Sequence, residues 1–185
     1  MLKKSFLLLS LSLVLLFQGC SSDTESEADN AMVATTDYVL KDTAGETYTV
    51  HKEAESFILN EHQKGIVLYD IFATWCPPCR AEAPHLASLQ KKYPNDLLIL
   101  GISIEEDITA AKLNEFKDKY EADYRITYGK ASIDLSRIIA STIHIGQQFP
   151  IPLMVMYKDG KYVTHYAGAI PEEMIESDIK QALGR

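Results

Sequence analysis

Cysteine is scarce in this 185-residue chain, which contains three, and tryptophan occurs once. Basic runs are missing apart from Lys3-Lys4, and the formal net charge is −8, so the composition argues against a nucleic-acid partner. No apolar stretch reaches the roughly 20 residues that a membrane-spanning helix needs. With 46% apolar and 24% charged residues, the chain has the composition of one ordinary domain with appendages.

Motifs for metals and haem are also missing. One cysteine pair in the domain cannot complete a four-cysteine zinc site, and no two histidines have the spacing of a zinc motif. Cys79 is followed by Arg80 and not by histidine, which excludes covalent attachment of a c-type haem. The sequence therefore predicts no resident cofactor and no metal.

The N-terminus has the pattern of an export signal. Lys3 and Lys4 precede the apolar residues 6–17, a stretch of signal-peptide length. The residues Leu16–Cys20 resemble a bacterial lipobox, in which the cysteine is lipidated and becomes the new N-terminus. We therefore expect a lipoprotein signal peptide over residues 1–19 and a lipid on Cys20. The alternative is a plain signal peptide with a stray cysteine.

Residues 20–36 are polar, small and acidic, and we expect them to form a flexible tether between the lipidated Cys20 and the domain. The domain is expected over residues 37–185. Apolar patterns and turn signals in it predict α/β secondary structure. The expected elements are a β-hairpin over 38–50, a short helix over 53–62, strands over 66–72, 97–104, 153–157 and 162–167, and helices over 77–93, 107–121, 133–143 and 172–183.

The segment Trp75-Cys76-Pro77-Pro78-Cys79 lies where a buried strand gives way to a helix. Cysteines three positions apart at a helix start are close enough to bond to each other, and this arrangement is typical of redox chemistry. The helix dipole favours the thiolate of the first cysteine. We therefore expect Cys76 to be an exposed nucleophile, and Cys79 to be more buried and to resolve the mixed disulfide.

Two neighbouring residues have a functional and a structural interpretation. Asp70 interrupts an apolar strand, and a carboxyl buried there has a raised pKa; alternatively, it points to solvent from an edge strand. Trp75, the one tryptophan, either forms a lid or docking surface beside Cys76 or packs in the core.

The segment from Asp70 to Pro84 (DIFATWCPPCRAEAP) resembles the active-site segment of TlpA/ResA-type proteins, which are membrane-tethered thiol–disulfide oxidoreductases of bacteria. The resemblance extends from about Asp37 to the C-terminus. It implies a thioredoxin fold, in which helices flank a central mixed β-sheet, with an N-terminal β-hairpin and an extra strand and helix. The stretch over residues 120–148 is longer than a minimal thioredoxin needs.

The resemblance also implies roles for two acids. Asp70 occupies the position of the buried thioredoxin acid, which exchanges a proton with the second cysteine. Glu82 occupies the position of the acid that TlpA/ResA-type proteins carry near the disulfide. The alternative for Glu82 is a solvated residue on the helix.

Substrate contacts are implied in the same way. The family's cis-proline has two candidates here, Pro150 and Pro152, and Pro152 is preferred for its spacing from Gly160. Ile151 would then supply a backbone edge to substrate. Pro77 and Pro78 lie beside the cysteines and join this surface.

The predicted function is an exported thiol–disulfide oxidoreductase, lipid-anchored in the bacterial cell envelope. A reductase of exported proteins, for instance in cytochrome c maturation, is preferred. Its partners are protein thiols or disulfides and a membrane electron donor or acceptor. Three alternatives remain open, namely an oxidase that introduces disulfides, a Cu(I)-handling thiol module, and a redox-inert docking module.

Overall fold

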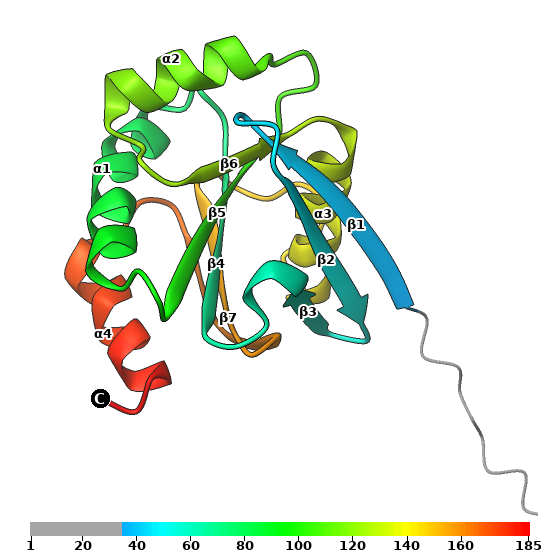
Figure 1. Ribbon diagram of the computed structural model, residues 1–185, viewed down its shortest axis with the longest axis vertical. Helices are drawn as coiled ribbons and strands as arrows, with labels where there is room; N and C mark the ends of the chain where they lie inside the picture. The colour runs from blue at the N-terminus through cyan, green and yellow to red at the C-terminus, as the bar shows by residue number, and fades with distance from the viewer. Residues whose placement is uncertain (1–34) are drawn as a thin grey trace, which may run out of the picture. The chain divides into compact units, whose positions relative to one another are not determined.

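Eight strands form one mixed sheet in the order β3-β2-β1-β6-β5-β4-β7-β8 in the computed structural model, which describes residues 35–185 (Figure 1). The strands are β1 (Thr35–Asp42), β2 (Thr47–Glu53), β3 (Ser56–Leu59), β4 (Ile66–Phe72), β5 (Leu97–Ser103), β6 (Arg125–Tyr128), β7 (Leu153–Lys158) and β8 (Lys161–Ala167). The helices are α1 (Pro77–Lys92), α2 (Ala110–Tyr120), α3 (Lys130–Thr142) and α4 (Glu172–Ala182). The predicted signal peptide, the lipidated Cys20 and most of the predicted tether lie outside the described residues.

β4 is the central strand, and all seven of its residues are buried. It pairs in parallel with β5 and antiparallel with β7. Successive side chains of a strand point to opposite faces, so β4 contributes to two cores. One core contains Ile66, Leu68 and Phe72 and is covered by α1, α2 and α4. The other contains Tyr69 and is covered by α3 and the N-terminal strands.

The N-terminal strands bring the two ends of the sheet together. Phe57 on β3 donates its backbone N–H to the carbonyl of Gly160, which lies in the turn between β7 and β8, at 2.9 Å. The Phe57 ring also meets Tyr157 edge-on, with 5.3 Å between ring centroids. Gly160 has φ +78°, and a Cβ there would lie 2.5 Å from Ile58. A glycine is therefore required at this position, where β3 lies against the turn between β7 and β8.

The thioredoxin fold with its hairpin and extra strand and helix is confirmed, whereas one predicted helix is wrong. Residues 53–62 contain the last residue of β2, a turn, β3 and a 3₁₀ turn (Asn60–His62). Phe57 and Leu59 alternate with less buried neighbours and pair with β2, so a period of two decides the structure. The extra strand is β6, which joins β1 to β5. The sequence did not predict the position of β6, because a strand of four residues is too short to show a clear alternation.

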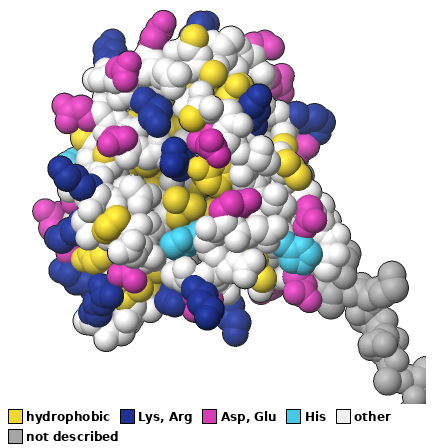
Figure 2. All heavy atoms as spheres, in the orientation of Figure 1, with side chains coloured by type: hydrophobic (Ala, Val, Ile, Leu, Met, Phe, Trp, Pro, Cys, Tyr) yellow, Lys and Arg dark blue, Asp and Glu magenta, His cyan; other side chains and the backbone are white. Residues whose placement is uncertain are grey.

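Acidic and basic side chains are interspersed over the face of the domain drawn in Figure 2. In the domain over residues 35–185, no helix is long and apolar enough to cross a membrane.

Candidate active site

The two domain cysteines lie at the start of α1 and form a disulfide, with 5.3 Å between their Cα atoms. Cys76 is the N-cap residue of the helix, and the N–H of Cys79 donates to the Cys76 sulfur at 3.3 Å. Pro77 and Pro78 occupy the first helical positions and have no N–H to donate. Cys79 therefore supplies the first backbone donor that the helix can offer to Cys76.

Both sulfur-bearing side chains are buried. Cys76 is 2% exposed and Cys79 is 4% exposed, so the expectation of an exposed Cys76 and a more buried Cys79 is wrong for the oxidised protein. The cause is the loop before β7, since the Cys76 sulfur lies 3.8 Å from the carbonyl oxygen of Ile151. The neighbouring Trp75 is 61% exposed, which contradicts the interpretation of Trp75 as a core residue.

The loop that covers Cys76 contains a cis peptide bond between Ile151 and Pro152, as the family resemblance implied. Pro152 is buried, and its carbonyl accepts the N–H of Gly168 at 2.8 Å. Ile151 is partly exposed and packs against both cores. The segment after β8 thus holds the loop in place beside the disulfide.

Asp70 is buried in the core that also contains both cysteines, because it shares a face of β4 with Leu68 and Phe72. Its side chain is 3% exposed, and β4 is an internal strand, so the alternative of an edge strand facing solvent is wrong. The hydroxyl of Tyr124 donates to Asp70 Oδ2 at 3.0 Å. Burial raises the pKa of Asp70 to about 7, although the Tyr124 hydrogen bond acts in the opposite direction.

Glu82 lies one turn after Cys79 on α1 and is 2% exposed, so it is not a solvated helix residue. Its Oε1 accepts the N–H of Ile170 at 3.3 Å, while Oε2 is buried without a hydrogen-bond partner among the described residues. Burial, and then the nearby charge of Asp70, raise the pKa of Glu82 to about 8. Two carboxyl groups near the disulfide therefore hold protons close to neutral pH.

A clamp around Thr74 was not predicted from the sequence. The carboxylate of Glu105 accepts the Thr74 N–H at 2.6 Å and its hydroxyl at 3.0 Å. On the other side, Arg80 Nε donates to the Thr74 carbonyl at 2.6 Å, and its guanidinium lies 5.5 Å from the centroid of the Tyr120 ring. The clamp fixes the backbone just before Trp75. One signal was available, because Glu105 follows β5, which runs parallel to β4.

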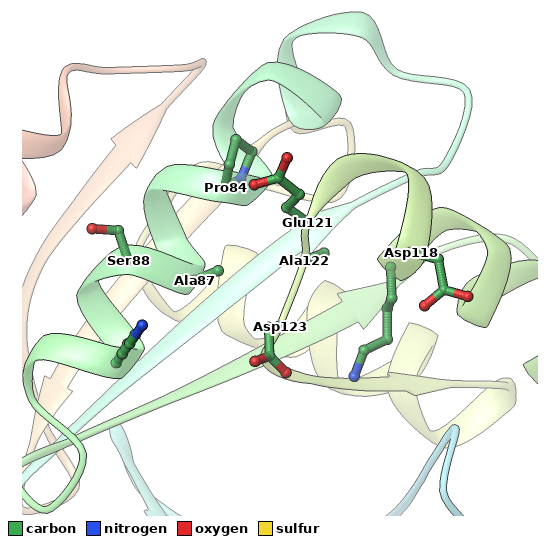
Figure 3. A pocket seen from close by; sticks show the side chains of 9 residues that line it. Pro84, Ala87, Ser88, Asp118, Glu121, Ala122 and Asp123 are labelled. Atoms are coloured by element: carbon green, nitrogen blue, oxygen red, sulfur yellow. The ribbon is translucent and has the colours of Figure 1, made fainter.

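The described domain offers no alternative metal centre, since no three His, Cys, Asp or Glu residues within it are grouped to hold an ion. An open pocket of about 620 Å³ lies between α1 and the end of α2, and Figure 3 shows Pro84 of α1 beside Glu121, which follows α2. None of the predicted site residues lines it. The structure thus brings Cys76, Cys79, Asp70, Glu82 and the Ile151–Pro152 loop together elsewhere, at the start of α1.

Comparisons with known proteins agree with this geometry. Residues 27–183 match the Redoxin family. The thiol-disulfide oxidoreductase ResA of Bacillus thuringiensis is 26% identical over 148 residues, which cover 74% of this chain and 80% of that protein. The thioredoxin-like protein YneN of Bacillus subtilis is 33% identical over 69 residues, which cover 37% of this chain and 41% of that protein.

Solved structures show the same fold. A thioredoxin-family thiol:disulfide interchange protein from Chlorobium tepidum has a TM-score of 0.63 at 18% identity, over 80% of this chain and 94% of that one. A secreted disulfide oxidoreductase of Mycobacterium tuberculosis has a TM-score of 0.55 at 16% identity, over 78% and 95%. The chain therefore belongs to the Redoxin family, and within it is a thiol–disulfide oxidoreductase of the TlpA/ResA type with a thioredoxin fold.

Proposed function

We propose that this protein is an exported disulfide reductase of the bacterial cell envelope, tethered to the membrane by a lipid on Cys20. It cycles Cys76 and Cys79 between dithiol and disulfide and keeps cysteines of exported proteins reduced, for instance during cytochrome c maturation. A membrane electron donor restores the dithiol. The observation that carries this proposal is the pair of buried acids, Asp70 and Glu82, in the core beside the cysteines.

The acids matter because only a thiolate attacks a disulfide. In the proposed reaction, the Cys76 thiolate attacks a sulfur of the substrate disulfide and forms a mixed disulfide, and the other substrate sulfur leaves as a thiolate. Asp70 or Glu82 then takes the proton of the Cys79 thiol. The Cys79 thiolate attacks the Cys76 sulfur, and the second substrate sulfur leaves as a thiolate. The protein is thereby oxidised to the disulfide, and the substrate gains the two electrons that the protein loses.

The start of α1 supports the reductive direction. A strong disulfide oxidant has a stabilised reduced form, which requires many interactions with the thiolate of its first cysteine. Here Pro77 and Pro78 remove two N–H donors, and the N–H of Cys79 is the backbone donor to the Cys76 sulfur. Ionised Asp70 or Glu82 opposes a thiolate further. The reduced form is therefore weakly stabilised, as a reductase requires.

The reduction potential of the Cys76–Cys79 pair tests the direction. We expect a value near or below that of thioredoxin, about −270 mV, when protein lacking residues 1–20 is equilibrated with defined thiol buffers. A value near that of a strong oxidant, about −120 mV, would make the protein a disulfide donor instead. Failure to observe any reversible dithiol–disulfide transition would favour the Cu(I) alternative.

The tether has a separate test. With Cys20→Ala in the full chain, we expect exported protein to move from the membrane fraction to the soluble fraction, because a lipid cannot be attached to alanine. The variant Cys79→Ala serves as the matched control, since it also lacks one cysteine but keeps the proposed attachment site. Membrane association that survives Cys20→Ala would disprove the lipid anchor and leave the redox assignment unchanged.

A further inference from the structure

We propose that Tyr124 is a positioning residue for the buried acid Asp70. Its ring crosses β5 at Gly101, where no side chain stands in the way, and its hydroxyl holds the Asp70 carboxyl in place. This inference rests on the proposed role of Asp70 in proton exchange with Cys79. It adds a residue that the family resemblance did not identify.

Tyr124 reaches Asp70 from a strand that is not its neighbour. It directly precedes β6, whereas Asp70 lies in the middle of β4, and β5 separates these two strands in the sheet. The phenol oxygen nevertheless lies 3.0 Å from Asp70 Oδ2, and both side chains are buried. The tyrosine ring must therefore lie across β5.

Gly101 is the residue of β5 that makes this crossing possible. It pairs with Asp70 on β4 and with Ile126 on β6. A Cβ at this position would lie 3.1 Å from Cε2 of Tyr124 and 3.0 Å from Cγ1 of Ile126, both closer than ordinary packing contacts. Gly101 does not have the positive φ that favours glycine. The space that the Tyr124 ring and the Ile126 side chain occupy therefore explains the glycine.

The elements packed around Asp70 offer few other charged or titratable groups. Glu82 approaches from α1, together with the two cysteines. Its Oε1 accepts the N–H of Ile170, and within the described residues it forms no hydrogen bond with Asp70. Lys117 of α2 donates to the backbone carbonyl of Tyr124 at 2.7 Å. The same core also contains Tyr93 and Tyr166, whose hydroxyls donate to Glu176 and Asp178. The other residues of this core are apolar, for example Met154 and Met156 of β7 and Ile175 and Ile179 of α4.

The Tyr124 hydrogen bond has two consequences. A phenol that donates to a carboxyl group stabilises the ionised form, so it offsets part of the effect of burial on Asp70. It also occupies Oδ2, whereas no hydrogen bond within residues 35–185 occupies Oδ1. The Asp70 carboxyl is thus held at one oxygen and free to exchange a proton at the other.

The variant Tyr124→Phe in the full chain tests the proposal, because it removes the hydroxyl and keeps the ring. We expect the pH profile of thiol–disulfide exchange to move its Asp70-dependent midpoint up by about one pH unit, the order of effect of one hydrogen bond to an ionised group. Carboxyl NMR of the same protein should show the same shift for Asp70.

Tyr69→Phe is the matched control. Tyr69 is also fully buried and lies next to Asp70 in the chain, but its hydroxyl has no partner among the described residues. We expect its pH profile to match that of the unmodified protein. A further comparison uses Asp70→Asn, in which Tyr124→Phe should cause no additional shift.

Three results would overturn the inference. The first is an unchanged profile in Tyr124→Phe while Asp70→Asn alters it, which would leave the role of Asp70 intact. The second is an equal shift in Tyr124→Phe and Tyr69→Phe, which would indicate a general packing effect. The third is an unchanged profile in Asp70→Asn, which would remove Asp70 from the proposed function as well.

Discussion

Cys76→Ser should reduce the exchange of protein disulfides to the uncatalysed background. A serine hydroxyl at the N-cap of α1 keeps the helix start, because serine is itself a favourable N-cap residue, but it cannot attack a disulfide as a thiolate does. The measurement is the rate at which the reduced protein lacking residues 1–20 reduces a protein disulfide such as that of insulin. Circular dichroism should show an unchanged fold.

Cys79→Ala is the comparison that separates the roles of the two cysteines. This variant keeps the proposed nucleophile but lacks the group that releases the substrate, so it should accumulate mixed disulfides through Cys76. Mass spectrometry of the trapped species would identify the bonded sulfur. Residual turnover by Cys76→Ser, or trapping through Cys79 in that variant, would reverse the assignment of the two residues.

Asp70→Asn should slow exchange by about 100-fold near pH 7, the order of magnitude that a positioned general base contributes. Asparagine keeps the size of the side chain and can still accept the Tyr124 hydrogen bond, but it cannot take a proton from Cys79. The measurement is single-turnover kinetics over pH 6–9. Glu82→Gln is the parallel variant for the second acid, and equal rates for Asp70→Asn and the unmodified protein across this range would remove Asp70 from the mechanism.

The same Asp70→Asn variant should be more stable than the unmodified protein at and above neutral pH. The pKa of Asp70 is about 7 in the folded protein against 3.8 for an ordinary aspartate, so between these values the unfolded chain has lost a proton that the folded protein keeps. Stability contributed at this site therefore falls as the pH rises from about 4 to about 7. Asparagine does not titrate, so above pH 7 the free energy of unfolding of Asp70→Asn should exceed that of the unmodified protein by about 4 kcal/mol. Urea unfolding of both proteins at pH 5 and pH 8 would measure this difference.

Much of this site was predictable because its residues lie close together in the chain or match a family pattern. Cys76 and Cys79 are three positions apart at a helix start, and an acid within the apolar run of β4 indicates a buried carboxyl. The cis peptide bond before Pro152 followed from the family resemblance, with the distance from Pro152 to the turn at Gly160 used to place it. Each of these residues was therefore predicted from its neighbours in the chain or from its match to the family pattern.

The burial of Cys76 and the roles of Tyr124 and Glu105 were not predictable in this way. Each depends on contacts between residues far apart in the chain, such as the Ile151 carbonyl beside Cys76 or the Tyr124 ring across Gly101. β3 was missed for a related reason. Its alternation covers only four residues, and the strand is held by pairing with β2 and by the hydrogen bond from Phe57 to Gly160, which lies far along the chain.

The burial of the disulfide has a kinetic consequence. The loop at Ile151 covers the Cys76 sulfur, and Cys76 is 2% exposed, so we expect small thiols in solution to reduce the oxidised protein slowly. A thiol that attacks the Cys76 sulfur needs this loop to move aside first. The rate of electron transfer to this disulfide therefore depends on access to Cys76 as well as on reduction potential, and a partner that moves the loop gains speed without any change in equilibrium.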